Sequence, residues 1–384
     1  MFPKITSVFL NLTNTCNLSC KYCFVHQNPQ KITLQVAKDS ADWVASNCRE
    51  KERPFINLFG GEPLLMYNEI IKPLIKYIRD KYQENFDLGI TSNCTLMTED
   101  VAEFLSENKV GLLLSMDGDK YSQDVNRPLK DGGSSFEILY PKLQMIRRYW
   151  PEVTFRSTIT PITAPHLFEN IMFAEKMGFI NYFAMPDCFE SWSDSDINIL
   201  KTEIEKYTNH YIKSFQQDKN PIIFGDIEKM FSVIIERNRA IENNVYREES
   251  FCKSCGKCGL GASRSAGINL NGDVVSCQEL FSCQDDIFVI GNIYDGINDE
   301  KRASLCEWWD SKDFYGKDCP NCKLNRVCSG YCVINNYLSG DIHKVPSILC
   351  DWKQIEFENA VKIAMTLGEE ENKRFKERWG IYVR

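Results

Sequence analysis

The sequence predicts an α/β fold in which parallel βα units form a sheet or barrel, followed by a smaller cysteine-rich domain. Apolar runs alternate with amphipathic helical patterns up to about residue 235. Beyond that point the helical periodicity fades, and nine of the 17 cysteines, not counting Cys283 and Cys306, fall between Cys252 and Cys350. We therefore expect a first domain over residues 1–235 and a second over residues 236–384, held by ligated metal more than by a large core.

The individual elements follow from these patterns. Six apolar runs are expected to be strands, at residues 6–12, 55–59, 87–91, 111–116, 154–160 and 182–186. Helices are expected near residues 34–48, 68–82, 99–108, 135–149, 166–177, 195–217 and 225–243, with a final helix over residues 352–378. Thr98 followed by Glu99 and Asp100 is typical of a helix start, and Asn271-Gly272-Asp273 is typical of a hairpin turn.

Composition excludes several classes of protein. The 384 residues carry a net charge of -8, which does not suit a nucleic-acid-binding surface. No segment has the apolar length of a membrane helix, and the N-terminus does not resemble a signal peptide. We expect a cytoplasmic protein with reduced thiols, in which clustered cysteines indicate metal or redox chemistry.

The first cysteine cluster comes directly after the first expected strand. Cys16, Cys20 and Cys23 have the spacing C-x3-C-x2-C. Three thiolates this close can hold three corners of an iron–sulfur cube, which leaves the fourth iron open for a substrate or cofactor. The alternative is a structural zinc loop in which His26 supplies the fourth ligand.

The cysteine loop, with Tyr22 before Cys23, resembles that of the radical S-adenosylmethionine (SAM) enzymes. Gly60-Gly61-Glu62-Pro63 ends the second strand and is similar to the GGEP segment of that family, whose backbone binds the SAM amino group. Two glycines would allow the backbone to approach the ligand closely. The resemblance implies a partial (β/α)6 TIM-like barrel over roughly residues 5–235, in which SAM chelates the open iron.

Further positions follow from the same resemblance. Ser92 and Asn93 end the third strand where relatives carry T-N-G, and Ser115 stands in a segment similar to S-L-D-G, where it is a candidate for the SAM carboxylate or ribose. Arg156 on the fifth strand is a second candidate to bind the SAM carboxylate. The alternative role for Arg156 is an ordinary ion pair at the barrel rim. Asp124 and Arg127 resemble part of an H-D-x-x-R segment, but Gln123 replaces the histidine, so we expect them to shape the loop.

The remaining cysteine pattern resembles the SPASM domain, which holds two auxiliary 4Fe–4S clusters. By that resemblance auxiliary cluster II takes Cys319, Cys322, Cys328 and Cys350. Auxiliary cluster I takes Cys258, Cys277, Cys332 and one of Cys252 and Cys255. The spare thiol leaves open whether cluster I has a fixed fourth ligand, and a pair of zinc sites is the alternative. Of the other cysteines, Cys94 at the end of the third strand is the one most suited to a role outside the core.

The resemblance implies three 4Fe–4S clusters, one-electron cleavage of SAM to a 5′-deoxyadenosyl radical, and hydrogen abstraction from a substrate carbon. No protein side chain is assigned as the catalytic group. The segments around Cys258, Cys277 and Gly291 resemble maturases that form Cys thioether crosslinks in ribosomally made peptides (sactipeptide and ranthipeptide types). The implied partners are a precursor peptide, an electron donor of the flavodoxin or ferredoxin type, and a separate leader-recognition protein.

Four other functions stay open at this point. Anaerobic sulfatase-maturating enzymes, which make formylglycine, are a more distant resemblance. They place an aspartate after the cysteine equivalent to Cys277, where this sequence has Gln278, although Glu279 could substitute. Carbon–carbon crosslinking and epimerisation are further possibilities for a peptide substrate. The protein could also be an electron-transfer module. Such a module would not need a cluster with an open iron beside a glycine-rich loop.

Overall fold

The computed structural model describes residues 2–242, 258–283, 285–308, 315–328, 330, 332–369 and 372–379. Cys252 and Cys255, two candidate ligands of auxiliary cluster I, lie outside these residues. Among the described residues, no helix combines the length and apolar character needed to cross a bilayer.

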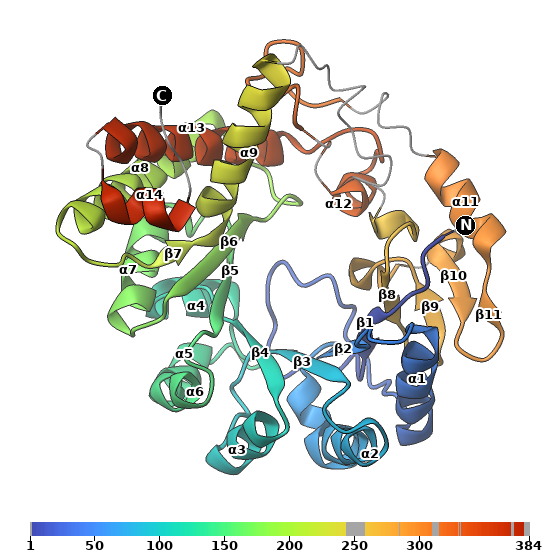
Figure 1. Cartoon of the computed structure of the whole chain (residues 1–384). Helices are drawn as coiled ribbons and strands as arrows, with labels where there is room; N and C mark the ends of the chain where they lie inside the picture. The colour runs from blue at the N-terminus through green and yellow to red at the C-terminus, as the bar shows by residue number, and fades with distance from the viewer. Residues whose placement is uncertain are drawn as a thin grey trace.

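Six parallel strands lie side by side along an arc, with α1, α2, α3 and α6 on its outer side (Figure 1). Each strand agrees with its expected position to within one residue, and the predicted α/β partial barrel is confirmed. The strands are β1 (Ser7–Asn11), β2 (Phe55–Phe59), β3 (Asp87–Ser92), β4 (Val110–Ser115), β5 (Thr154–Ile159) and β6 (Asn181–Pro186).

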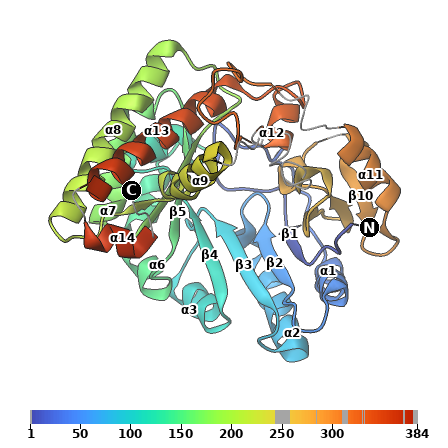
Figure 2. The same ribbon diagram turned by 45° about the horizontal axis from the view of Figure 1, so that its top comes forward.

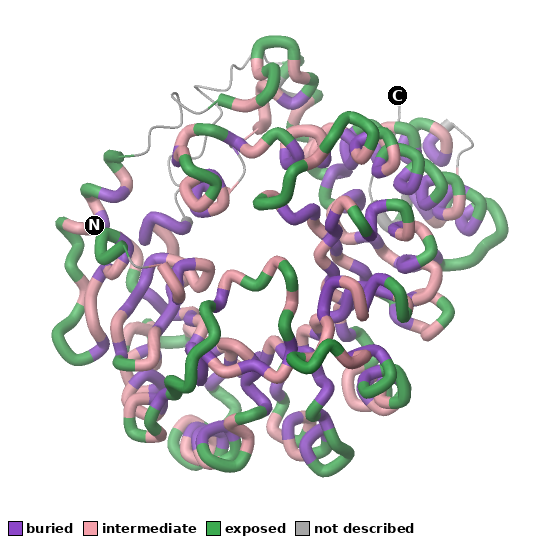
Figure 3. The backbone as a smooth tube through the Cα atoms, turned by 180° about the vertical axis from the view of Figure 1, so that it is seen from behind, coloured by how far each residue is buried: buried purple, intermediate pink, exposed green. Residues whose placement is uncertain are grey.

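The helices of the barrel also follow the predicted pattern. Thr98 caps α3 by accepting a hydrogen bond from the backbone of Val101, and Glu99 and Asp100 occupy the first turn, as expected. The helices are α1 (Leu34–Asn47), α2 (Lys72–Tyr82, after a π turn at Tyr67–Ile71), α3 (Glu99–Glu107), α4 (Lys120–Asn126), α5 (Ser135–Leu139), α6 (Leu143–Tyr149), α7 (Leu167–Lys176), α8 (Asp194–Gln216) and α9 (Gly225–Glu242). Figure 3 shows buried residues following the strands and the inward faces of these helices.

Two expectations about helices were incomplete or wrong. Helix α4 was not predicted, because its seven residues are too few to show a helical period. The single final helix over residues 352–378 was wrong, since the structure has α13 (Ser347–Glu369) and α14 (Lys373–Trp379). Helix α13 begins after Pro346, whose carbonyl accepts a hydrogen bond from the backbone of Leu349 and so forms the first turn.

The sheet extends beyond the six strands at both edges. The short strand β7 (Ile223–Phe224) pairs with β6, and β8 (Ser265–Ile268) pairs in parallel with β1. Beyond β8 lie β9 (Asp273–Val275), β10 (Val289–Asn292) and β11 (Gly296–Ile297), in antiparallel order. The predicted turn at Asn271-Gly272-Asp273 joins β8 to β9, with Gly272 at a φ of 88°. The sheet therefore continues from the barrel into the cysteine-rich region.

The C-terminal region contacts both edges of the open barrel (Figure 2). At the β1 edge, Arg302 of α11 (Asp299–Trp308) donates hydrogen bonds to the carbonyls of Gly261 and Pro3 at 2.6 and 3.1 Å. At the β6 edge, α13 packs against α8 and α9, with Trp352 of α13 fully buried. The short helix α12 (Val333–Leu338) lies between these two contacts and brings Asn335 to the cavity described below.

Candidate active site

The cysteine loop lies over the carboxyl end of the barrel strands. Its backbone is held by the segment that follows α4: Ser19 donates to the carbonyl of Pro128 at 2.9 Å, and Lys21 donates to that of Asn126 at 3.0 Å. These bonds direct one group of thiols toward a cavity of about 280 Å³, which Cys16, Cys20 and Cys23 line together. The structure therefore brings the three predicted cluster ligands to one site.

The three thiols of this loop differ in exposure: Cys16 is buried, Cys20 is half-buried and Cys23 is exposed. Burial raises the pKa of Cys16 to about 11 and that of Cys20 to about 12, and it also raises the pKa of Cys23. The free thiols would be protonated at neutral pH. A metal centre that binds them as thiolates must therefore displace their protons.

The glycines of the Gly60-Gly61-Glu62-Pro63 segment have a role that sequence reasoning missed. A Cβ on Gly60 would lie 2.4 Å from the carbonyl oxygen of Thr13, and one on Gly61 would lie 2.3 Å from that of Thr15. The two glycines thus let the end of β2 pack against the loop that carries the cysteines. The backbone N–H of Gly61 donates to the Thr13 carbonyl at 2.7 Å and fixes this approach. Both glycines also line the cavity.

The Glu62 carboxylate joins the ends of β2 and β3. It accepts hydrogen bonds from the hydroxyl of Ser92 at 2.7 Å and from the backbone of Asn93 and Leu64 at 2.9 and 3.0 Å. Glu62 is almost completely buried, and burial raises the pKa of its carboxyl group. Pro63 follows it at the start of a 3₁₀ turn (Pro63–Met66). Glu62 and Asn93 line the cavity, whereas Ser92 and Pro63, two further residues predicted to bind SAM, do not.

The end of β3 also connects to the cysteine loop. The Asn93 amide donates to the Asn17 side chain at 3.0 Å, and the Asn17 amide donates to the hydroxyl of Thr95 at 2.7 Å. The next residue, Cys94, is fully buried at a φ of 56°, a conformation that favours glycine. Cys94 does not line the cavity, so the structure places it in the core.

A buried ion pair anchors the loop to β4 and β5. Asp117 accepts a hydrogen bond from Nε of Arg127 at 3.0 Å and one from the backbone of Thr158 at 3.0 Å. The hydroxyl of Tyr22 donates to the other oxygen of Asp117, and the Arg127 guanidinium lies 5.2 Å from the centre of the Tyr22 ring. Asp124 instead accepts hydrogen bonds from Ser134 and Phe136, which agrees with a loop-shaping role.

Arg127, by contrast, lines the cavity. It is therefore part of the site in addition to shaping the loop, which was the role predicted from the sequence. Ser115 and Arg156 line the same cavity, and their binding of SAM stays a prediction. The Arg156 guanidinium lies 4.3 Å from the centre of the Phe183 ring and donates to the carbonyl of Ser157. Among the described residues Arg156 has no ion-pair partner, which disfavours the rim ion pair as its role.

Another part of the cavity lining comes from the end of β6 and from the cysteine-rich region. It includes Asp187, Cys188 and Phe189 after β6, together with Glu279 and Asn335. Glu279 also forms no ion pair within the described part of the chain. Sequence reasoning named Glu279 only as a substitute base, and it missed Cys188 because a lone cysteine after a strand carries no distinctive pattern.

A second group of thiols lies apart from the first. Cys319, Cys322, Cys328 and Cys350 line one small cavity of about 40 Å³, which matches the set expected for auxiliary cluster II. The backbone of Gly316 donates to Sγ of Cys319 at 3.1 Å, and a Cβ on Gly316 would lie 2.6 Å from Sγ of Cys350. Four thiols around a glycine backbone suit either a cubane cluster or zinc.

The third set is only partly described. Cys277 and Cys332 are both half-buried, and the backbone of Cys258 opens a 3₁₀ turn (Cys258–Leu260). With Cys252 and Cys255 outside the described residues, the ligand set of auxiliary cluster I stays a prediction.

These features define an α/β partial barrel with three cysteines facing one cavity at its mouth. The model of the radical SAM superfamily matches residues 10–172. The cysteine-type anaerobic sulfatase-maturating enzyme of Clostridium perfringens is 24% identical over 348 residues, which is 86% of this chain and 89% of that protein. The radical SAM cyclopropyl synthase TigE of Paramaledivibacter caminithermalis is 23% identical over 352 residues, 86% of this chain and 68% of that protein.

An uncharacterized protein of Methanocaldococcus jannaschii is 28% identical over 180 residues, and the match spans 46% of this chain and 61% of that protein. Among solved structures, native anSMEcpe with bound AdoMet and a peptide has a TM-score of 0.73 at 20% identity, covering 95% of this chain and 99% of that one. SuiB of Streptococcus suis bound to its precursor peptide SuiA has a TM-score of 0.59 at 15% identity, and the match covers 91% of this chain and 76% of that one. The match over residues 10–172 identifies a radical SAM enzyme, and the cysteine-rich C-terminal region shares the fold of these relatives.

We predict that Gly61→Ala lowers the free energy of unfolding by about 1–3 kcal/mol, because the new Cβ would press on the Thr15 carbonyl and overpack the loop. Gly111→Ala on β4 is the matched control, since the nearest atom to a Cβ there is 3.7 Å away. Urea unfolding of both variants measures the difference. Equal stabilities would contradict the role assigned to Gly61.

Proposed function

We propose that this radical SAM enzyme is a peptide maturase that installs an oxidative crosslink, in the first instance a Cys thioether, in a ribosomally made precursor. The observation that carries the proposal is the composition of the cavity. The cysteine loop forms one wall, and a carboxylate from the cysteine-rich region, Glu279, stands on another. A substrate side chain in this space would lie between a metal centre and a proton acceptor.

The residues present fit the cofactors. Cys16, Cys20 and Cys23 would hold the cluster that binds SAM, because their thiols share the cavity with the Gly60–Gly61 backbone. Arg156 is suited to the SAM carboxylate, since a guanidinium pairs with a carboxylate in a fixed, bidentate geometry. The two further cysteine sets would hold auxiliary clusters I and II, which gives three 4Fe–4S clusters in all.

When bound, SAM and its cluster supply reductive cleavage of SAM and removal of one hydrogen atom from a substrate carbon, and the auxiliary clusters supply an acceptor for one electron. The protein contributes position and exclusion of water. Thioether formation replaces one C–H and one S–H bond by a C–S bond. The hydrogen atom leaves with the SAM-derived product, the electron leaves to the acceptor, and the remaining thiol proton passes to the Glu279 carboxylate.

A peptide substrate is supported by the relatives. The structures of anSMEcpe and SuiB that resemble this chain hold peptides, and SuiB holds a precursor peptide. The further partners we propose are an electron donor of the flavodoxin or ferredoxin type and a separate leader-recognition protein.

Formylglycine formation is the second candidate. It is favoured by the likeness to anSMEcpe over 99% of that chain. It is disfavoured by Gln278, which stands where those enzymes place an aspartate, although Glu279 brings a carboxylate to the cavity one residue later.

The identity of the product separates the two candidates. We expect the anaerobically reconstituted protein, given SAM, reductant and a cysteine-containing precursor peptide, to yield a product that has lost two hydrogen atoms and kept its sulfur. Formylglycine made from cysteine would instead lose the sulfur, and this outcome would contradict the thioether proposal. Cys16→Ala is the control, because it removes one ligand of the SAM cluster and should abolish formation of 5′-deoxyadenosine while auxiliary iron is retained.

Glu279→Gln keeps the size of the side chain and removes its capacity to accept a proton. We expect formation of the crosslinked product to fall by about a hundredfold or more, while SAM cleavage continues. Glu190→Gln is the control, since Glu190 lies after β6, is exposed and does not line the cavity. Mass spectrometry of the peptide and chromatography of 5′-deoxyadenosine give the two rates. Wild-type product formation by Glu279→Gln would rule out this carboxylate as the proton acceptor.

A further inference from the structure

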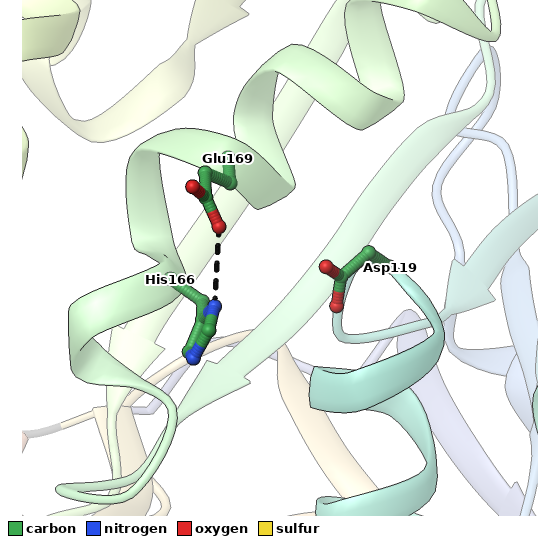
Figure 4. Close-up of side chains that lie close together, drawn as sticks. All are labelled: Asp119, His166 and Glu169. Carbon is green, nitrogen blue, oxygen red and sulfur yellow. Dashed lines mark hydrogen bonds and ion pairs between the residues drawn. The ribbon is translucent and has the colours of Figure 1, made fainter.

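A second group of metal-ligating side chains lies at the barrel rim, outside the cavity. It consists of Asp119, from the loop between β4 and α4, with His166 and Glu169, from the start of α7. One ligand atom from each of the three residues lies within 4.8 Å of the other two. In Figure 4 a dashed line joins Glu169 to the His166 ring, and the Asp119 carboxylate is turned toward this pair.

The histidine is held in place by its neighbours. Nδ1 of His166 lies 3.2 Å from a carboxylate oxygen of Glu169, one helical turn along. The Tyr121 ring packs on the imidazole with 4.6 Å between ring centres. The Nε2 atom is the second ring nitrogen, and either nitrogen can bind a metal when the other is protonated.

Apart from the contact of Glu169 with His166, the two carboxylates have no basic partner among the described residues. Within the described residues, neither Asp119 nor Glu169 forms an ion pair with a lysine or arginine. The adjacent Lys120 turns away and pairs with Asp124 and Glu137 at 3.2 and 2.7 Å. One oxygen of Asp119 accepts a hydrogen bond from the backbone of Ser122, which leaves its carboxylate anchored at the rim. Converging carboxylates without a basic partner favour a bound cation.

We propose that Asp119, His166 and Glu169 form a binding site for a single divalent transition-metal ion, separate from the iron–sulfur sites. One imidazole nitrogen and two carboxylate oxygens suit Mn²⁺, Fe²⁺ or Zn²⁺, with water in the remaining positions. The ion joins the loop after β4 to the first turn of α7. Asp119 is two residues from Asp117, so the ion stabilises the segment that anchors the cysteine loop.

The test uses Mn²⁺, because its preference for oxygen ligands limits competition from the many thiols of the chain. Iron–sulfur-loaded protein is titrated anaerobically with Mn²⁺, and the electron paramagnetic resonance signal of the free ion gives the number of ions bound. We expect one ion per chain in the wild type and binding that is weaker by about tenfold or more in His166→Ala and in Glu169→Gln. Glu169 is largely exposed, so its substitution leaves the fold intact.

The matched control is His210→Ala. His210 forms a similar imidazole–carboxylate pair with Glu175 at 2.9 Å, and no second carboxylate of the described residues lies within ligand distance. We expect this variant to bind Mn²⁺ as the wild type does. The proposal is overturned if the wild type binds no Mn²⁺ at millimolar concentration, if both site variants bind it as the wild type does, or if His210→Ala loses it equally.

Discussion

The buried carboxylate of Asp117 is the point on which the arrangement of the site depends. It receives the Arg127 guanidinium, the Thr158 backbone and the Tyr22 hydroxyl, and so connects β4, the segment after α4, β5 and the cysteine loop. A charge pair removed from water is stabilising only when its remaining hydrogen bonds are satisfied. Those bonds fix Tyr22 between Cys20 and Cys23, and thereby direct the three thiols of the loop toward one cavity.

The cysteine-rich region completes the barrel rather than standing beside it. Strand β8 extends the sheet at the β1 edge, and α13 packs at the opposite edge against α8 and α9. With both edges held, the segment between them can bring Glu279 and Asn335 to the cavity that the cysteine loop also lines. An open barrel thus obtains part of its site from residues more than two hundred positions along the chain.

The sequence predicted the strands and the three cysteines well because both leave local patterns: alternating burial along a strand, and thiols at fixed spacing. It could not predict what depends on contacts between distant residues. Gly60 and Gly61 could be recognised as a motif, but their packing on Thr13 and Thr15 depends on the pairing of β1 with β2. Asp117 belongs to the segment similar to S-L-D-G, but only Ser115 of that segment was predicted to have a role in the site. The parallel pairing of β8 with β1 could not be predicted either, because neither strand's own sequence indicates its partner.

The measurement that tests this account most directly is the iron content of Asp117→Asn, with Asp124→Asn as the control carboxylate on the neighbouring helix. If Asp117 holds the cysteine loop, its variant keeps its auxiliary clusters but loses about four irons per chain, the content of one cubane cluster, together with SAM cleavage. Asp124→Asn keeps both. An Asp117→Asn protein with the full iron count and the wild-type rate of 5′-deoxyadenosine formation would contradict the account.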